Sequence, residues 1–282
     1  MFRSRLFSSV ILIGLLILMV WQEYRTALFV LVSLLGLIAQ SEFYAMQEAK
    51  GLRVFKKAGL ICGAAFFIIT YVGLVFLKGD VRNTKALETF IILLSILFIL
   101  GRQVFEKKQS TALATVALTL FGFFYIPYLF HFIPKIFFNE ASSQGNGVML
   151  ALYLVAVTKV TDIGAYLWGS WLGRHKMIPL ISPKKTWEGL AGGILTALAL
   201  SLFLTWLMPN ALAPIVGIHA VILGVLLSSV SVVGDLAESV IKRDSDTKDS
   251  GVVIPGIGGS LDLVDSLLYT GPLFYCYLIL IS

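Results

Sequence analysis

Long, uninterrupted runs of apolar residues dominate this sequence and restrict it to a small set of folds. Each run is close to the roughly 20 residues that a helix needs to cross a bilayer. Only 13% of the residues are charged, about half the share in a soluble domain. The runs are continuous rather than alternating, which argues against a β-barrel. The sequence therefore predicts an all-α, polytopic transmembrane helix bundle with about nine spans, at 6–21, 26–40, 59–77, 86–101, 112–133, 147–169, 187–208, 215–235 and 260–281.

Lysine and arginine residues indicate how these spans are oriented. With a cytoplasmic N-terminus, sixteen of the 22 basic residues fall on the cytoplasmic side, five fall on the other side, and Lys159 lies within a span. This bias follows the positive-inside rule, and nine spans then place the C-terminus outside. The first run lacks a small-residue cleavage site, so we expect it to be retained. The pattern fits a bacterial inner membrane, and an organelle membrane is the alternative.

The net charge of +6 does not require a nucleic-acid partner. The basic residues lie between apolar runs, where topology and anionic lipid headgroups account for them. Polar residues are distributed unevenly along the chain. Residues 1–146 carry apolar spans and ordinary loops, whereas charged residues gather at span ends within 147–282. We expect an N-terminal transmembrane scaffold and a C-terminal catalytic region whose site faces the cytoplasm.

Asp162 lies inside the sixth predicted span. A charge near the bilayer centre costs at least about 2.5–3.5 kcal/mol on insertion scales, so this carboxylate needs a cation, a partner or a watery cavity. Lys159 is three residues earlier, on the same helical face. A structural Lys159–Asp162 pair is one interpretation. A functional site that faces a cavity is the interpretation we favour.

Two pairs of acids occur at the ends of later spans. Asp235 and Glu238 are three residues apart, as are Asp262 and Asp265, so each pair shares one helical face. Clustered carboxylates repel one another unless a cation is bound, and hard oxygen ligands suit Mg²⁺. A favourable helix dipole is an alternative explanation for Asp262 and Asp265. It does not explain acids at the C-terminal end of a helix.

Basic residues accompany these acids. Lys184 and Lys185 precede the seventh span, and Lys242, Arg243 and Lys248 follow the Asp235 pair. The positive-inside rule alone predicts some lysines here. Carboxylates for a metal together with cations for phosphates nevertheless suit phosphoryl or nucleotidyl transfer.

A glycine-rich segment, residues 254–260, leads into the last span and contains Gly256, Gly258 and Gly259. Such a segment allows backbone N–H groups to approach a phosphate at a helix N-terminus. It matches neither a P-loop nor a dinucleotide fingerprint. A plain turn is the alternative.

Several motifs follow one another in a fixed order near the C-terminus. They are the segments 239–243, 248–249 and 255–259 and the acids Asp262 and Asp265. In this order they resemble the signature of the phosphatidate cytidylyltransferases, or CDP-diacylglycerol synthases. The segments 162–166, 182–189 and 234–239 resemble internal motifs of that family. Two positions depart from the signature: its usual His is Ile257 here, and its usual Arg is Leu263.

The resemblance implies a reaction, its substrates and the residues that carry it. CTP and phosphatidate would react to give CDP-diacylglycerol and pyrophosphate. Membrane lipids and a second copy of the chain, in a homodimer, are further predicted partners. Asp235 and Asp262 match the metal-binding acids of the family, and Mg²⁺ is the expected cofactor, with a second cation as an option at Asp162. The other residues that the resemblance places at the site are Glu238, Asp265, Lys184, Lys185, Lys242, Arg243, Lys248, Asp249 and, with the glycines, Ser182.

Two other functions remain open on sequence grounds. A CTP-dependent polyprenol or lipid kinase would use similar nucleotide-binding residues but transfer a different group. An ion-coupled secondary transporter would also carry intramembrane acids and helices broken by Gly or Pro. Transporters often show such breaks in both halves. In this sequence the polar residues are confined to one half and one membrane face, which favours the enzyme.

Overall fold

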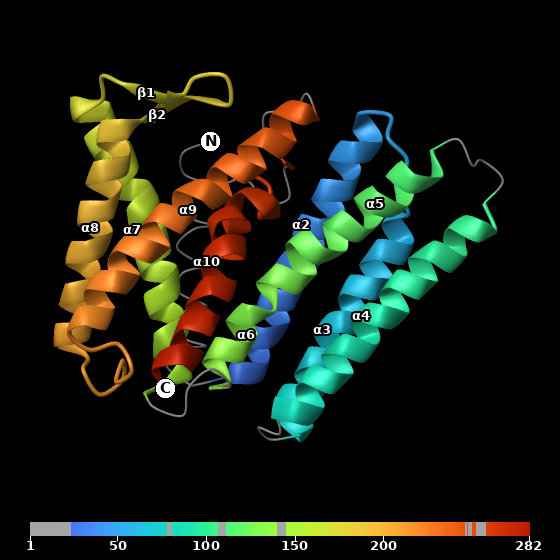
Figure 1. The fold of residues 1–282 in the computed structure, drawn as a ribbon, viewed down its shortest axis with the longest axis horizontal. Helices are drawn as coiled ribbons and strands as arrows, with labels where there is room; N and C mark the ends of the chain where they lie inside the picture. The colour runs from blue at the N-terminus through green and yellow to red at the C-terminus, as the bar shows by residue number, and fades with distance from the viewer. Residues whose placement is uncertain are drawn as a thin grey trace. The chain divides into compact units, whose positions relative to one another are not determined.

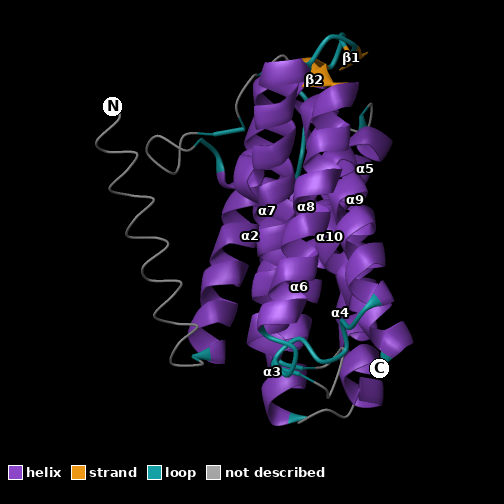
Figure 2. Cartoon of the chain, turned by 90° about the vertical axis from the view of Figure 1, so that its left-hand side faces the viewer, coloured by secondary structure: helices purple, strands orange, loops and turns teal. Residues whose placement is uncertain are grey.

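The structure is a computed structural model that describes residues 24–77, 81–106, 111–139, 145–245, 247, 250–251 and 258–282. These residues are almost entirely helical (Figures 1 and 2). The one sheet among them is an antiparallel pair, β1 (Lys176–Ile178) and β2 (Ser182–Thr186). The helices are α2 (Arg25–Ala49), α3 (Lys56–Phe76), α4 (Val81–Val104), α5 (Ala112–Phe123), η1 (Phe124–Tyr128), α6 (Phe132–Phe137), α7 (Gly147–Leu172), α8 (Trp187–Leu207), α9 (Ile218–Asp244) and α10 (Ser260–Ile281).

Eight helical segments in the described part of the chain are long and apolar enough to cross a membrane. They correspond one to one with eight of the nine predicted spans, and the remaining prediction, 6–21, lies outside the described residues. The prediction of an all-α membrane protein is confirmed, with eight described spans rather than about nine. The predicted span 112–133 is formed by α5, η1 and α6 in succession. Pro127 lies within the π-turn η1, where it cannot donate a backbone N–H.

The described residues form two compact units. The first contains the residues up to Pro134 together with 244–264, and the second contains 135–243 together with 265–282. The first unit therefore includes the connection between α9 and α10 and the first turn of α10. The predicted division at residue 146 separates a scaffold from a catalytic region. It is a different division from these two units, and it stays a prediction.

Hydrogen bonds between buried side chains and backbone join the helices of the first unit. Gln40 of α2 donates to Tyr44 Oη at 3.1 Å and to the carbonyl of Gly59 in α3 at 3.0 Å. Tyr44 in turn donates to the carbonyl of Thr119 in α5 at 2.7 Å. These bonds satisfy polar groups that would otherwise be costly in a nonpolar interior. They join α2, α3 and α5 around an apolar core.

Small residues bring α7 and α8 close together in the second unit. A Cβ added at Gly189 would lie 2.8 Å from the carbonyl oxygen of Ala165, and one added at Gly193 would lie 3.0 Å from that of Thr161. The two glycines are four residues apart on α8. This spacing allows helix backbones in membranes to approach within van der Waals contact.

The segment between α7 and α8 forms a β-hairpin. Pro183 lies inside β2, which a two-stranded sheet tolerates because both strands are edges. Thr186 ends the strand and caps α8 by accepting the Gly189 N–H at 3.1 Å. Glu188 accepts the backbone N–H groups of Arg174 and His175. These bonds position the lysine-bearing strand at the start of α8.

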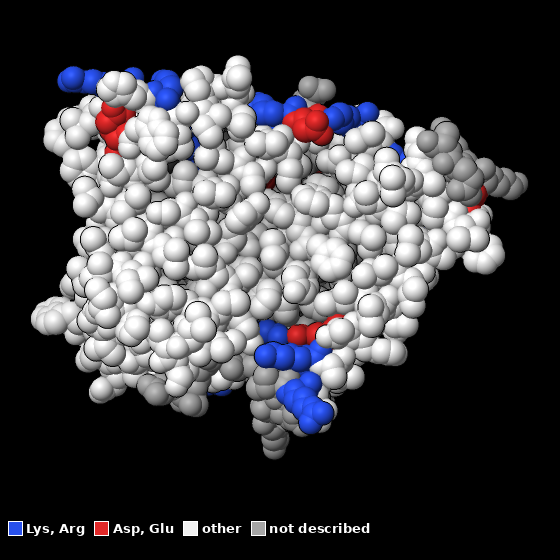
Figure 3. All heavy atoms as spheres, in the orientation of Figure 1, with Lys and Arg blue, Asp and Glu red and all other residues white. Residues whose placement is uncertain are grey.

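Charged side chains occupy a small part of the visible surface. Figure 3 shows Lys, Arg, Asp and Glu in a few patches, with uncharged side chains over the rest of this face. Large apolar side chains such as Leu97, Leu195 and Trp206 are exposed. This pattern is expected where lipid is the solvent, because lipid chains cannot hydrate charges.

Candidate active site

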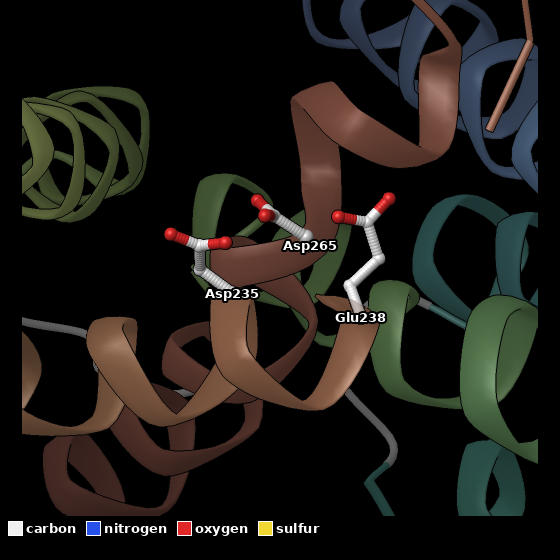
Figure 4. Close-up of side chains that lie close together, drawn as sticks. All are labelled: Asp235, Glu238 and Asp265. Atoms are coloured by element: carbon white, nitrogen blue, oxygen red, sulfur yellow. The ribbon is translucent and has the colours of Figure 1, made fainter. Parts of the chain in front are cut away.

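Three carboxylates from two helices converge in the second unit. Asp235 and Glu238 come from α9 and Asp265 comes from α10, and Figure 4 shows the three side chains close together. One carboxylate oxygen from each lies within 4.8 Å of the others. Glu238 and Asp265 are buried, at 1% and 6% exposure. The geometry joins acids that are about 30 residues apart in the sequence.

Gly234 explains why the two helices come so close at this point. A Cβ added there would lie 3.0 Å from the carbonyl oxygen of Asp265 and 3.1 Å from Cα of Ser266. Both contacts are with backbone, which cannot rotate away as a side chain can. A glycine immediately before Asp235 therefore allows the α9 acids to meet Asp265.

Lysines from three elements neutralise these acids. Lys185 of β2 pairs with Asp235 at 2.7 Å, and Lys242 pairs with Glu238 at 2.7 Å. Lys159 of α7 lies 4.0 Å from Asp265. The cluster therefore contains cations as well as carboxylates, as expected for charges removed from water.

Asp162 extends this cluster along α7. Lys159 lies 3.8 Å from Asp162, so the structural pair considered from the sequence is present. The same lysine also reaches Asp265, and Asp162 is close enough to Asp235 and Lys185 to interact with both charges. Ser231 of α9 donates to Asp162 at 3.5 Å. The intramembrane acid thus belongs to a larger charged cluster rather than to an isolated ion pair.

The donor set of the cluster fits a hard divalent cation. Asp235, Glu238 and Asp265 offer carboxylate oxygens alone, which Mg²⁺ prefers over nitrogen or sulfur donors. Three carboxylates this close repel one another unless positive charge lies among them. The structure supplies part of that charge through lysine side chains, which are long and can move aside. The residues of the cluster suit Mg²⁺, and binding of this ion stays a prediction.

Asp262 has well-defined backbone partners in the first unit. Its Oδ2 accepts the N–H of Gly259 at 2.9 Å and that of Ser250 at 3.4 Å. The bond to Gly259 is the one made by the acid of a capping box, at the third position of a helix. The helix-end alternative for Asp262 therefore has support. Its predicted role as a metal ligand stays a prediction.

Gly258 and Gly259 occupy positions where a side chain does not fit. Gly258 has φ +121°, a conformation that L-residues rarely adopt. A Cβ at Gly259 would overlap Ser250 Oγ and lie 2.8 Å from Glu42 Oε2. Here the glycines allow carboxylates to reach the backbone. Phosphate binding by these glycines stays a prediction.

The remaining predicted site residues are distributed around the cluster or lie outside the described residues. Ser182 and Lys184 are on β2, and Lys184 is exposed. Arg243 donates to the carbonyl of Ile181 at 3.4 Å, which joins the end of α9 to the hairpin. Three predicted residues, Lys248, Asp249 and Gly256, lie outside the described residues.

Sequence reasoning missed Glu42, a buried acid of α2. Its carboxylate accepts the backbone N–H groups of Ser260 at 3.0 Å and Leu261 at 2.8 Å, and the hydroxyl of Ser250 at 3.5 Å. Its exposed fraction is 6%. The available signal was an acid just past the end of an apolar run. The predicted span ends at residue 40, which leaves Glu42 outside it.

Comparisons with known proteins identify the family of this chain. The phosphatidate cytidylyltransferase of Synechocystis is 32% identical over 99% of this chain and 97% of its own length. The enzyme of that name from Bacillus subtilis is 32% identical over 90% of this chain and 89% of its own. An uncharacterized protein of Escherichia coli, YnbB, is 36% identical over 67% of this chain and 62% of its own. Residues 3–281 match the cytidylyltransferase family. This integral membrane protein therefore belongs to the cytidylyltransferase family, whose members are nucleotidyltransferases.

Proposed function

We propose that this protein is a phosphatidate cytidylyltransferase and that the cluster of Asp235, Glu238 and Asp265 is the centre of its active site. The reaction joins CTP and phosphatidate to give CDP-diacylglycerol and pyrophosphate. The proposal rests chiefly on one observation: three carboxylates within 4.8 Å of one another, with lysines paired to them, in a chain of this family.

The reaction requires alignment of the substrates and neutralisation of their charge more than it requires proton transfer. A phosphate oxygen of phosphatidate attacks the α-phosphorus of CTP, and the bond from that phosphorus to the bridging oxygen of pyrophosphate breaks. The attacking phosphate is already anionic at neutral pH, so no general base is needed. The barrier comes largely from bringing two anions together, and positioned cations lower it.

Lys185 and Lys242 are well placed for that task. Each is bonded at 2.7 Å to a carboxylate of the cluster. An ammonium group held there would neutralise the triphosphate or the lipid phosphate once substrate binds. Lys184 lies on β2 and Arg243 lies at the end of α9, and both would extend the same positively charged surface.

Asp235, Glu238 and Asp265 would hold Mg²⁺, with Asp262 one helical turn earlier on α10 as a predicted further ligand and Asp162 as a predicted site for a second cation. When bound, Mg²⁺ neutralises phosphate oxygens and polarises the phosphorus under attack. We further propose that this site faces the cytoplasm, with the N-terminus cytoplasmic and the C-terminus outside. The predicted homodimer stays a prediction.

Purified protein in detergent tests the proposal directly. With phosphatidate, Mg²⁺ and CTP labelled at the α-phosphorus, we expect label in a lipid product and release of pyrophosphate. A lipid kinase would transfer label only from the γ-phosphorus, and a transporter would label no lipid. Either of those results would refute the cytidylyltransferase assignment.

A further inference from the structure

We infer that Glu42 of α2 is a positioning residue that anchors the first turn of α10, and so places Asp262 for the reaction. Nothing in the sequence motifs assigns Glu42 a role, and the inference rests on the proposed function for its catalytic consequence. Its structural basis is independent of that function. The anchor consists of Glu42 and the three groups that donate to it, on Ser250, Ser260 and Leu261.

The carboxylate of Glu42 accepts hydrogen bonds from the first backbone N–H groups of α10. The first N–H groups of an α-helix have no partner within the helix. Glu42 Oε1 accepts that of Ser260 at 3.0 Å, and Oε2 accepts that of Leu261 at 2.8 Å. Asp262 accepts the preceding N–H, from Gly259. The two carboxylates thus satisfy three consecutive donors, and the negative charge is favourable at the positive end of the helix dipole.

Glu42 also ties this helix end to the preceding connection. Its Oε2 accepts the hydroxyl of Ser250 at 3.5 Å, so a single carboxylate joins residue 250 to residues 260 and 261. A Cβ at Gly251 would lie 2.5 Å from Glu42 Oε1, and one at Gly259 would lie 2.8 Å from Oε2. Both glycines therefore leave room for this carboxylate.

Other contacts along α2 hold the same connection. Gln47 donates to Ser245 Oγ at 3.1 Å, and Lys50 pairs with Asp244 at 2.8 Å. One face of α2 thus contacts residues from the end of α9 to the start of α10. At the helix end itself, Glu42 accepts the two backbone N–H groups, and the Leu35 carbonyl of α2 accepts the Ser260 hydroxyl at 2.9 Å.

The anchor has a functional consequence through helix geometry. Asp262 lies in the first turn of α10, directly after the anchored residues Ser260 and Leu261. A displacement of that turn would move the Asp262 carboxylate directly, because the helix backbone transmits the shift. Reaction rates are sensitive to such shifts, since a misplacement of about 1 Å can cost about a hundredfold in rate.

The main test compares Glu42→Gln with Glu48→Gln. Glu42→Gln keeps the size of the side chain but removes its charge and one acceptor. Glu48 lies on the same helix, is more exposed, and pairs weakly with Lys56 at 3.9 Å, so its replacement is a matched control. For Glu42→Gln we expect about a hundredfold loss of kcat and a higher Mg²⁺ concentration for half-maximal activity. Glu42→Asp should recover part of the loss.

A structural defect alone would lower the amount of folded protein without changing the Mg²⁺ requirement of the active fraction. Thermal unfolding and gel filtration in detergent measure the folded fraction. Wild-type kcat and Mg²⁺ requirement in Glu42→Gln would overturn the catalytic part of the inference.

Hydrogen–deuterium exchange tests the anchor without relying on activity. The amides of 259–261 should exchange faster in Glu42→Gln than in the wild type, and Glu48→Gln should leave them unchanged. Unchanged exchange in Glu42→Gln would overturn the anchor itself. If the wild type makes no liponucleotide, the proposed function fails, and faster exchange in Glu42→Gln would still support the anchor.

Discussion

Carboxylates in the two units of this protein are stabilised in different ways. Glu42 in the first unit is satisfied by backbone N–H groups, which are fixed by the helix they belong to. Asp235, Glu238 and Asp265 in the second unit are balanced largely by lysine side chains. Fixed dipoles hold a carboxylate permanently, whereas flexible ammonium groups can be replaced by a metal ion or turn toward a phosphate. The comparison separates an acid that builds the structure from acids that are available for chemistry.

The largest effect should follow from loss of an acid in the second unit. Asp235→Asn removes a charge but preserves shape, and we expect activity to fall by at least about a thousandfold because a predicted metal ligand is lost. Thermal unfolding should change little, since Lys185 can turn toward solvent. Liponucleotide formation at saturating Mg²⁺ measures the effect. Activity near the wild-type level would remove Asp235 from the metal site.

Replacement of a cation should have the next largest effect. Lys185→Met keeps the apolar stem and removes the ammonium group that pairs with Asp235, so we expect about a hundredfold loss in kcat/KM for CTP. Lys185→Arg should retain part of the activity. The matched control is Lys176→Met on the neighbouring strand β1, where the exposed side chain has no described partner in the cluster. Equal losses in the two Met variants would contradict a specific role for Lys185.

A backbone change should affect both activity and stability. Gly234→Ala places a Cβ 3.0–3.1 Å from the backbone of Asp265 and Ser266, which forces α9 and α10 apart by a few tenths of an ångström. We expect a destabilisation of about 1–3 kcal/mol, typical of overpacking, with a parallel loss of activity. Chemical unfolding in detergent measures the first and the CTP assay measures the second. Unchanged stability would show that α9 and α10 can adjust at Gly234 to make room for the added Cβ.

The smallest effect should come from an exposed ion pair. Glu48→Gln removes the partner of Lys56, 3.9 Å away, with both side chains partly solvated. Such pairs contribute about 0–1 kcal/mol, so we expect no resolvable change in unfolding. Activity should remain at the wild-type level. A large loss would show that exposed acids on α2 matter as much as the buried Glu42, and the contrast between them would disappear.

The sequence predicted much of this fold and most of the types of group at the site. Eight spans followed from hydropathy, and the prediction that Asp162, Asp235 and Asp265 act at the site followed from carboxylates in apolar surroundings. The hairpin containing β2 was missed because Pro183 and adjacent lysines are typical of a loop. Glu42 was missed because the predicted span ended at residue 40 and because its partners include backbone groups more than 200 residues away, which leave no pattern in side-chain chemistry.

The sequence alone determined which segments enter the membrane, because each transmembrane helix satisfies its own backbone hydrogen bonds and each apolar run is solvated by lipid independently of the others. Tertiary structure alone decided which acids meet one another and which meet a helix end. Those outcomes depend on how helices cross, as at Gly234, and on contacts between distant segments. Periodicity within a single helix does not specify such contacts.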